Sequence, residues 1–237
     1  MKKHIITSLL LLVATLCALA NDAMETIEMS ELNTSENESP KYVSHIGTMW
    51  DLSIGKDWGF MRATVQQSVF TIDTELERAM SILSLDAPII PTYLRVNALG
   101  FYLYYRMGQG NYRHLLRYHA GLSGSVPLRP LNITWATRYE STYVLGNDGP
   151  TNKFRARLRL VSKIPNSKIQ PFIGSEFFLV LNNKNAGRGE RIWYDIGVSY
   201  TIDKNNKIEF LVREEQMILT TPRQWNTNIG FAYKISL

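Results

Sequence analysis

The stretch Trp225–Leu237 reads WNTNIGFAYKISL and gives the clearest indication of how the chain folds. Every second residue in it except Thr227 is large and apolar, and the residues between them are polar or small. Side chains alternate between the two faces of a β-strand, so a period of two predicts a strand rather than a helix. One face of the predicted strand is apolar, and the other carries Asn226, Asn228, Gly230, Ala232, Lys234 and Ser236.

The same alternation recurs along most of the chain from Trp50 onward. Each stretch is about ten residues long and places apolar side chains opposite polar ones. The stretches predict strands at Arg62–Val69, Tyr112–Val126, Leu131–Tyr143, Phe154–Leu160, Ile169–Leu181, Arg191–Ile202 and Ile208–Glu215.

Two segments do not follow this pattern. Tyr93–Arg106 carries aromatic residues on both faces, so the direction of its side chains stays undecided. Thr74–Pro91 falls where a short turn is expected but is too long for one. We interpret it either as a connection with a helix around Glu75–Leu83 or as a missed hairpin that would make twelve strands.

Both a soluble β-sandwich and a membrane barrel produce such alternation. The predicted strands are near the 9 to 11 residues that a tilted strand needs to cross a bilayer, whereas soluble strands average about five or six. Aromatic residues recur near strand ends on the apolar face, as in an interfacial belt: Trp50, Tyr112, Tyr143, Tyr194 and Trp225. The predicted fold class is therefore all-β, an antiparallel transmembrane β-barrel of about ten strands, with twelve or eight as alternatives.

The connections between the predicted strands differ in length. Arg129-Pro130, Pro165–Ser167 and Asp203–Asn206 are short, as periplasmic turns are. Leu145–Asn152 and Asn182–Glu190 are longer and rich in Gly and Asn, as outward loops are. Ten strands with the amino end in the periplasm would place all five connections on the expected sides.

The first twenty residues have the features of a secretory signal peptide. Lys2-Lys3 precedes an apolar run from Ile5 to Leu16, and Ala18–Ala20 fits the small-x-small cleavage pattern. Cys17, the only cysteine, follows residues that suit a lipoprotein peptidase poorly, so lipidation is disfavoured. The mature chain is then free of cysteine, which excludes disulfides and thiol catalysis.

An acidic segment rich in Ser, Thr and Asn follows the signal peptide. It has six acidic and no basic residues from Asn21 to Pro40, a composition typical of disordered tails. The predicted organisation is a signal peptide at 1–20, an acidic disordered linker at 21–44 and an outer-membrane β-barrel at 45–237. The predicted location is the outer membrane.

The arginines of the barrel decide what its positive charge means. The chain has a formal net charge of +5, and without the two signal lysines and the acidic segment the charge from Lys41 onward is +9, which could suggest nucleic acid. An Arg that faces lipid at mid-bilayer costs about 2 to 4 kcal/mol, so the arginines of the polar strand faces are expected to line the lumen. Nucleic acid is therefore not an expected partner. The predicted lumen-lining residues are Arg113, Arg117, His119, Arg138, Glu140, Arg155, Arg157, Arg159, Glu176, Asp195, Glu209, Arg213 and Glu215, and Asp51 is expected on the same side.

No arrangement of residues predicts catalysis. His119 and Ser123 share a strand face near Glu140, but a separation of four residues is about 13 Å along a strand, too far for a nucleophile and its base. His119 is instead interpreted as a member of the charged network. The histidine spacing indicates no metal site, and no phosphate or dinucleotide motif is present, so no cofactor and no enzyme are predicted.

The second half of the chain contains motifs that resemble a known family. They are Arg155-x-Arg157-x-Arg159, Pro171-x-x-x-x-Glu176 and Arg191-x-x-x-x-x-Gly197-x-x-Tyr200, followed by the terminal strand. Within that strand, Asn228-x-Gly230-x-x-Tyr233-x-Ile235 resembles the C-terminal signal that the barrel-assembly machinery reads. From Phe154 onward the chain resembles a family of uncharacterised Gram-negative outer-membrane β-barrel proteins known only as a domain of unknown function. The resemblance implies an outer-membrane barrel and supplies no activity.

Three functional hypotheses follow for such a barrel. The leading one is a non-enzymatic structural or accessory protein whose charged lumen is plugged by ion pairs. The alternatives are a narrow channel for small anionic solutes and a lipid-modifying enzyme. The expected partners are outer-membrane lipid, the barrel-assembly machinery, which would read the C-terminal strand, and proteins bound at the rims.

Overall fold

The computed structural model describes residues 43–91, 93–107, 111–146, 149–220 and 223–237 of the 237-residue chain. This part of the chain is all-β and contains eleven strands. They are β1 (Val43–Asp57), β2 (Arg62–Ile72), β3 (Glu75–Ile90), β4 (Leu94–Met107), β5 (Asn111–Leu128), β6 (Leu131–Val144), β7 (Thr151–Ser162), β8 (Ile169–Val180), β9 (Gly189–Thr201), β10 (Asn206–Met217) and β11 (Gln224–Ser236).

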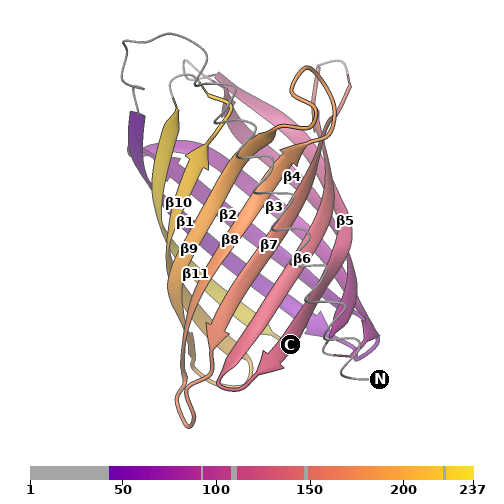
Figure 1. Cartoon of the computed structure of the whole chain (residues 1–237), viewed down its shortest axis with the longest axis vertical. Helices are drawn as coiled ribbons and strands as arrows, with labels where there is room; N and C mark the ends of the chain where they lie inside the picture. Colours follow the sequence, from indigo (N-terminus) through magenta and orange to yellow (C-terminus); the bar gives the residue numbers. More distant parts are fainter. Residues whose placement is uncertain (1–42, 92, 108–110, 147–148, 221–222) are drawn as a thin grey trace.

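The strands form one closed barrel in which each strand pairs with its neighbours in sequence (Figure 1). All of these consecutive pairs are antiparallel. The barrel closes between β1 and β11, which run parallel, with Thr48 opposite Ile229. An odd number of alternating strands makes the first and last strands run in the same direction, so only a parallel pair can close the ring.

The predicted number of ten strands is wrong, and so are the alternatives of eight and twelve. The missing strand is β3, which occupies most of the segment Thr74–Pro91 and replaces both the helix and the hairpin considered for it. β2 and β3 are joined by Asp73-Thr74, two residues with φ angles of 49° and 70°. Two successive positive φ angles are typical of the tight type I′ turn that connects antiparallel strands.

The connections fall into two groups at opposite ends of the barrel. The turns at 129–130, 163–168 and 202–205 lie at the end where β11 finishes, which we call the turn end. β6 and β8 finish, and β7 and β9 begin, at the other end, which we call the loop end (Figure 1). β1 begins at the loop end, because the eleventh strand reverses the placement expected for a barrel of ten.

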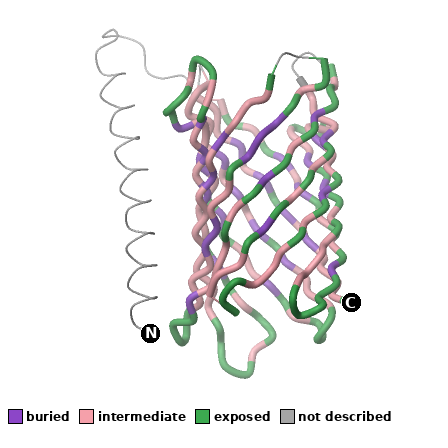
Figure 2. The backbone as a smooth tube through the Cα atoms, turned by 90° about the vertical axis from the view of Figure 1, so that its right-hand side faces the viewer, coloured by how far each residue is buried: buried purple, intermediate pink, exposed green. Residues whose placement is uncertain are grey.

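More buried and more exposed residues alternate along much of the barrel strands (Figure 2), as expected where side chains point in turn into the lumen and outward. On β1, Met49 points into the barrel and is 3% exposed, whereas the neighbouring Trp50 points outward and is 56% exposed. The predicted faces of β11 follow the same rule, with Asn226, Asn228 and Ala232 buried inside. The outer face is therefore largely apolar, and the polar residues gather in the lumen.

An apolar ribbon follows part of the inner wall, formed by Met49, Phe70, Phe172 and Leu211. Gly230 separates Met49 from Leu211 in the register, and Gly197 separates Leu211 from Phe172. A Cβ at Gly230 would lie 2.6 Å from Cε of Met49, and one at Gly197 would lie 2.5 Å from Cζ of Phe172. The two glycines thus leave the space that the large neighbouring side chains fill.

No helix in the part of the chain that the structure describes is long and apolar enough to cross a membrane. The predicted signal peptide at 1–20 and nearly all of the predicted linker at 21–44 lie outside the described residues. The first strand starts at Val43, two residues before the predicted start of the barrel.

Candidate functional site: the lumen of the barrel

The lumen contains a cavity of about 580 Å³ that is lined by side chains from every strand. Its wall has two chemically different sides. Strands β5 to β11 supply most of the charged side chains, whereas β3, β4 and the start of β5 supply mainly apolar ones. We call these sides the charged wall and the apolar wall.

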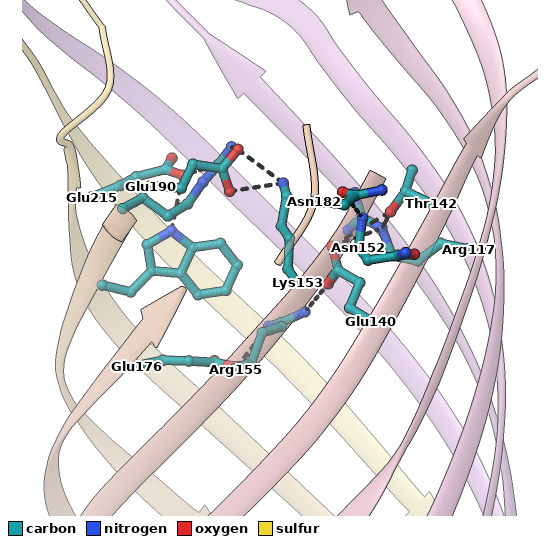
Figure 3. A network of polar contacts seen from close by, with 12 residues as sticks. Arg117, Glu140, Thr142, Asn152, Lys153, Arg155, Glu176, Asn182, Glu190 and Glu215 are labelled. Atoms are coloured by element: carbon teal, nitrogen blue, oxygen red, sulfur yellow. Dashed lines mark hydrogen bonds and ion pairs between the residues drawn. The ribbon is translucent and has the colours of Figure 1, made fainter. Parts of the chain in front are cut away.

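Glu140 on β6 connects two arginines of the charged wall (Figure 3). Its Oε2 lies 2.9 Å from Nη1 of Arg155, and its Oε1 lies 3.5 Å from Nε of Arg117. Arg155 also reaches Oε1 of Glu176 on β8 with Nη2, at 2.7 Å. One guanidinium therefore bridges two carboxylates that are almost completely buried, and loss of any member would leave an unbalanced buried charge.

A second group surrounds Asp195 on β9. Arg213 on β10 binds it through two parallel contacts, Nε to Oδ1 at 2.7 Å and Nη2 to Oδ2 at 3.0 Å. Arg157 on β7 approaches Oδ2 of the same carboxylate at 3.4 Å. The paired contacts with Arg213 match the fork geometry of the guanidinium, which makes this the best-defined ion pair of the wall.

A third group lies closer to the turn end around Glu209 on β10. Its two oxygens contact Nη2 of Arg159 and Nζ of Lys234, each at 2.9 Å. The hydroxyl of Ser199 donates a hydrogen bond to Oε2 at 3.2 Å. Three strands besides β10 are thus tied to one carboxylate.

Two ion pairs continue the charged wall toward the loop end. Nζ of Lys153 lies 2.7 Å from Oε2 of Glu190, a contact that joins β7 to β9 (Figure 3). Nη1 of Arg191 lies 2.6 Å from Oε1 of Glu215, and the indole of Trp193 donates to the same oxygen at 2.8 Å. Ion pairs therefore extend along the lumen from one end region of the barrel to the other.

Aromatic rings occupy the spaces between these arginines. The guanidinium of Arg155 lies 4.4 Å from the ring centre of Phe178, and that of Arg213 lies 4.2 Å from Trp193. Arg159 lies 3.4 Å above Phe172. A cation over an aromatic face is favourable, so the rings hold the arginines in place as well as filling volume.

The apolar wall faces this network across the cavity. In the register, Met80 of β3 is opposite Leu103 of β4, and Leu103 is in turn opposite Leu115 of β5. Ile82 and Phe101 form the next pair toward the turn end. Leu99 completes the group, and all six side chains line the cavity.

Arg138 on β6 lines the cavity without a close ion pair to any described residue. Among the residues that the structure describes, no carboxylate lies within ion-pair distance of it, and its buried Nε has no hydrogen-bond partner. Its Cγ would lie 3.0 Å from a Cβ at Gly121 on β5, so the side chain extends over that glycine. The Cα of Arg138 would also lie 2.8 Å from such a Cβ, so Gly121 leaves the space that the Arg138 side chain needs.

The family model described as "Protein of unknown function (DUF2490)" matches residues 94–227. The chain belongs to this family. The matched DUF2490 segment begins with β4 and ends within β11, so it contains most of the charged wall and the β4 part of the apolar wall. A search of curated proteins found no match.

The predicted lumen residues all lie within the DUF2490 segment, and the structure brings most of them together. Those that line the cavity are Arg117, Arg138, Glu140, Arg155, Arg157, Arg159, Glu176, Glu209 and Arg213, joined by Asp51 of β1. His119, Asp195 and Glu215 are buried in the ion-pair groups around it. Arg113 lies on the same face of β5 as Arg117 and His119, but it is exposed near the loop end of the strand.

The sequence interpretation missed several residues of the site. Lys153 and Arg191 have the same parity as the predicted residues on their strands. Lys234 lies on the face of β11 that is predicted to be polar but is not named among the predicted lumen residues. Arg78, which is buried with its guanidinium 4.1 Å from the ring centre of Phe70, lies on the unrecognised strand β3. The apolar wall was missed for the same reason.

His119 is placed within the ion-pair network and not beside a nucleophile. Its Nε2 lies 2.8 Å from Oε2 of Glu140, its ring centre lies 4.5 Å from that of Phe101, and 2% of the residue is exposed. The hydroxyl of Ser123 instead accepts a hydrogen bond from Nδ2 of Asn97 at 3.1 Å. No group of three or more His, Cys, Asp or Glu side chains in the described ranges is arranged to hold a metal ion.

Proposed function

We propose that this DUF2490 protein is an outer-membrane protein whose barrel lies in lipid and whose lumen is closed by ion pairs, with a structural or accessory role rather than an enzymatic one. The observation that carries the proposal is the apolar outer face of the barrel. Large apolar side chains are exposed on most strands, among them Trp50, Leu52, Ile54, Val65, Leu83, Leu116, Leu122, Ile173, Ile196, Phe210 and Ile229. A soluble monomer rarely exposes a contiguous apolar surface of this extent, whereas lipid requires one.

The aromatic residues of the outer face support the same environment. Near the loop end, the rings of Tyr104 and Tyr112 stack with centres 4.7 Å apart, and Tyr118 lies 6.0 Å from Tyr143. Tyr side chains favour the boundary between hydrocarbon and water, where the ring is in an apolar environment and the hydroxyl is hydrated. The loop end would then face outward and the turn end would face the periplasm.

Tryptophan fluorescence can test directly whether the outer face of the barrel lies in lipid. The chain has five tryptophans, so variants that keep only Trp50 or only Trp193, with Phe at the others, would be refolded into phosphatidylcholine vesicles whose acyl chains carry bromine. Bromine quenches tryptophan on contact. We expect strong quenching of Trp50, which points outward, and little quenching of Trp193, which lines the lumen. Equal quenching, or none for Trp50 in a variant whose circular dichroism shows a folded barrel, would contradict insertion.

In this proposal, the ion pairs of the charged wall close the lumen. A substitution at Glu176 distinguishes a lumen packed with ion pairs from an open channel. Glu176→Gln should lower the free energy of unfolding by about 3 kcal/mol, because the contact with Arg155 loses its charge in a buried setting. The matched control is Glu214→Gln, since Glu214 accepts a hydrogen bond from Thr227 and lies outside this network. Urea unfolding in micelles would measure both variants, and an unchanged stability for Glu176→Gln would argue against a packed ionic plug.

A narrow anion channel is the second candidate, and the composition of the cavity favours it. Cations outnumber carboxylates among the cavity-lining side chains. Single-channel recording of the refolded protein in a planar bilayer distinguishes the two proposals. A closed barrel should give no steady current. Ohmic steps with anion selectivity would show that the lumen is open and would favour the channel.

The partners in this proposal are those expected of an outer-membrane barrel. Lipid would contact the outer face, and the assembly machinery would read Asn228-x-Gly230-x-x-Tyr233-x-Ile235 on β11. Protein partners would bind at the rims, because loops are where barrels differ most and where binding residues concentrate.

A further inference from the structure

The two walls of the cavity differ in a way that an ionic plug does not require. A plug needs paired charges, but the apolar wall contributes six apolar side chains to the interior of the barrel: Met80, Ile82, Leu99, Phe101, Leu103 and Leu115. Five of them lie on β3 and β4, whose faces toward the lumen would be polar if only water and ions filled it. The apolar wall therefore indicates an apolar partner inside the barrel.

The size of the space suits a small molecule. A cavity of about 580 Å³ falls within the range of about 300 to 1,000 Å³ that is typical of sites for small ligands. Such sites combine apolar surface with a few polar groups that fix the orientation of the ligand. The lumen has this combination, because the apolar wall faces a wall of guanidinium groups.

The cations of the site select the charge of the ligand. Arg138 has no carboxylate within ion-pair distance among the described residues, and its Nε is buried without a partner. Within the described part of the chain, the one carboxylate in ion-pair distance of Arg157 is Asp195, at 3.4 Å, and Arg213 binds both oxygens of Asp195 more closely. A guanidinium binds a carboxylate or phosphate through two parallel hydrogen bonds, so Arg138 and Arg157 can accept an anionic group that the protein itself does not provide.

We propose that the lumen binds an anionic amphiphile, a molecule with one carboxylate or phosphate head and a single hydrocarbon chain. The head contacts Arg138 and Arg157 on the charged wall, and the chain packs against Met80, Leu103 and Leu115 on the apolar wall. The inference rests on the closed barrel and its cavity and not on its location in the membrane. A failure of this proposal is thus distinguishable from a failure of the proposed function.

Native mass spectrometry of the full mature chain, refolded in an uncharged maltoside detergent, tests the proposal. The probes are dodecanoate and dodecyl phosphate, compared with dodecanol, which has the chain without the charge, and with inorganic phosphate, which has the charge without the chain. We expect one molecule of either amphiphile per protein and binding at least about tenfold weaker for both comparison compounds. Tighter binding of dodecanoate would identify a fatty acid as the source of the head group, and tighter binding of dodecyl phosphate would identify a phospholipid fragment.

Paired variants connect the binding to the two walls. Arg138→Gln should weaken dodecanoate by about tenfold, whereas Arg129→Gln, at an exposed turn, should leave it unchanged. Leu115→Ala should weaken it as well, whereas Leu116→Ala, on the outer face of the same strand, should not. Circular dichroism would confirm that each variant is folded.

Three results would overturn the proposal. Dodecanol could bind as tightly as dodecanoate, which would show that the head is not recognised. Inorganic phosphate could match dodecyl phosphate, which would leave a simple anion site. Folded Arg138→Gln and Leu115→Ala variants could both bind like the parent, which would place the amphiphile on the outer face of the barrel.

Discussion

Gly197 and Gly230 show how strongly the inner wall depends on single residues. Each lies between two large side chains of the apolar ribbon, and neither has a positive φ, so their role is steric and not conformational. Interiors are packed closely enough that even one additional methyl group has a cost. The ribbon therefore requires the absence of a side chain at these positions as much as it requires Phe172 and Met49.

Gly197→Val should destabilise the barrel by about 3 kcal/mol, at the upper end of the usual cost of overpacking. A Cβ at this position would lie 2.4 Å from the carbonyl oxygen of Phe210 and 2.5 Å from Cζ of Phe172, and the backbone oxygen cannot move aside easily. Gly100→Val is the matched control, because a Cβ at Gly100 on β4 meets no atom within 4 Å. Urea unfolding in micelles would compare the variants, and equal stabilities would contradict the steric account.

Asp73 gives a prediction for pH at the loop end. Its Oδ2 lies 2.6 Å from Nδ1 of His45, and Oδ1 accepts a hydrogen bond from the backbone N–H of Ile46. These contacts lower the pKa of Asp73 below its usual range, and the hydrogen bond with His45 contributes most. The ionised form is thus favoured in the folded state, and its stabilisation is present above about pH 4 and is lost as the pH falls through the lowered pKa.

Asp73→Asn should therefore lower the stability slightly at neutral pH and make little difference at a pH below the folded pKa of Asp73. The effect is small because Asp73 is exposed and solvent screens its charge. Amide hydrogen exchange of β1 and β2 in micelles, measured from neutral to acidic pH, would report the difference between the parent and the variant. If the difference between the parent and the variant grew as the pH fell, the result would contradict a stabilising ionised Asp73.

β3 and β4 differ from the other strands in how well the sequence predicts them. Strands of the charged wall alternate clearly, because their lumen faces are polar and their outer faces apolar. β3 and β4 turn Met80, Ile82 and Leu103 into the lumen, so apolar residues occupy both faces and the period of two loses its contrast. One strand was missed and the other was left undecided for this single physical reason.

The same contrast explains which parts of the site could be predicted. The cost of exposing Arg to lipid assigns a direction to each Arg on an alternating strand, as for Arg155 and Arg213. The partner of each Arg depends on the register and on strand order, which the alternation does not contain. An apolar residue such as Leu115 gives no such assignment, because lipid and a packed lumen both accept it. Departures from a local rule are expected at functional sites, and here they coincide with the apolar wall.

The turn between β2 and β3 allows a prediction for this part of the barrel. Thr74 has a φ of 70°, which is unfavourable for a β-branched residue. Glycine adopts this φ without strain. Thr74→Gly should therefore increase the free energy of unfolding by about 1 kcal/mol. Urea unfolding in micelles would measure the change, with Thr71→Gly as a control that should lower the stability, since Thr71 lies within β2 and bonds to Thr48. A loss of stability in Thr74→Gly would contradict a type I′ turn at Asp73-Thr74.

The parallel pair of β1 and β11 is the feature on which the whole molecule depends, because it alone converts a row of hairpins into a closed barrel. Without this pair, both strands would expose unpaired backbone groups along an edge. Its register also brings Met49 next to Gly230 and thereby continues the apolar ribbon across the closure. The odd number of strands, the packing of the apolar ribbon and the parallel closure therefore depend on one another. An experiment that tests the closure tests all three.

A disulfide between β1 and β11 provides that test. Thr48 and Ile229 are opposite each other in the register and both point outward, and neighbouring strands are about 4.8 Å apart, within the Cα separation that a disulfide spans. In a chain with Cys17 replaced by Ser, the double variant Thr48→Cys with Ile229→Cys should form an internal crosslink on mild oxidation, detected by its altered mobility in a denaturing gel. Thr48→Cys with Tyr233→Cys should not, because four residues of offset add about 13 Å along the strand. Crosslinking of the second pair but not the first would show a different register between β1 and β11. Crosslinking of neither pair in a folded protein would mean that the barrel does not close through these two strands.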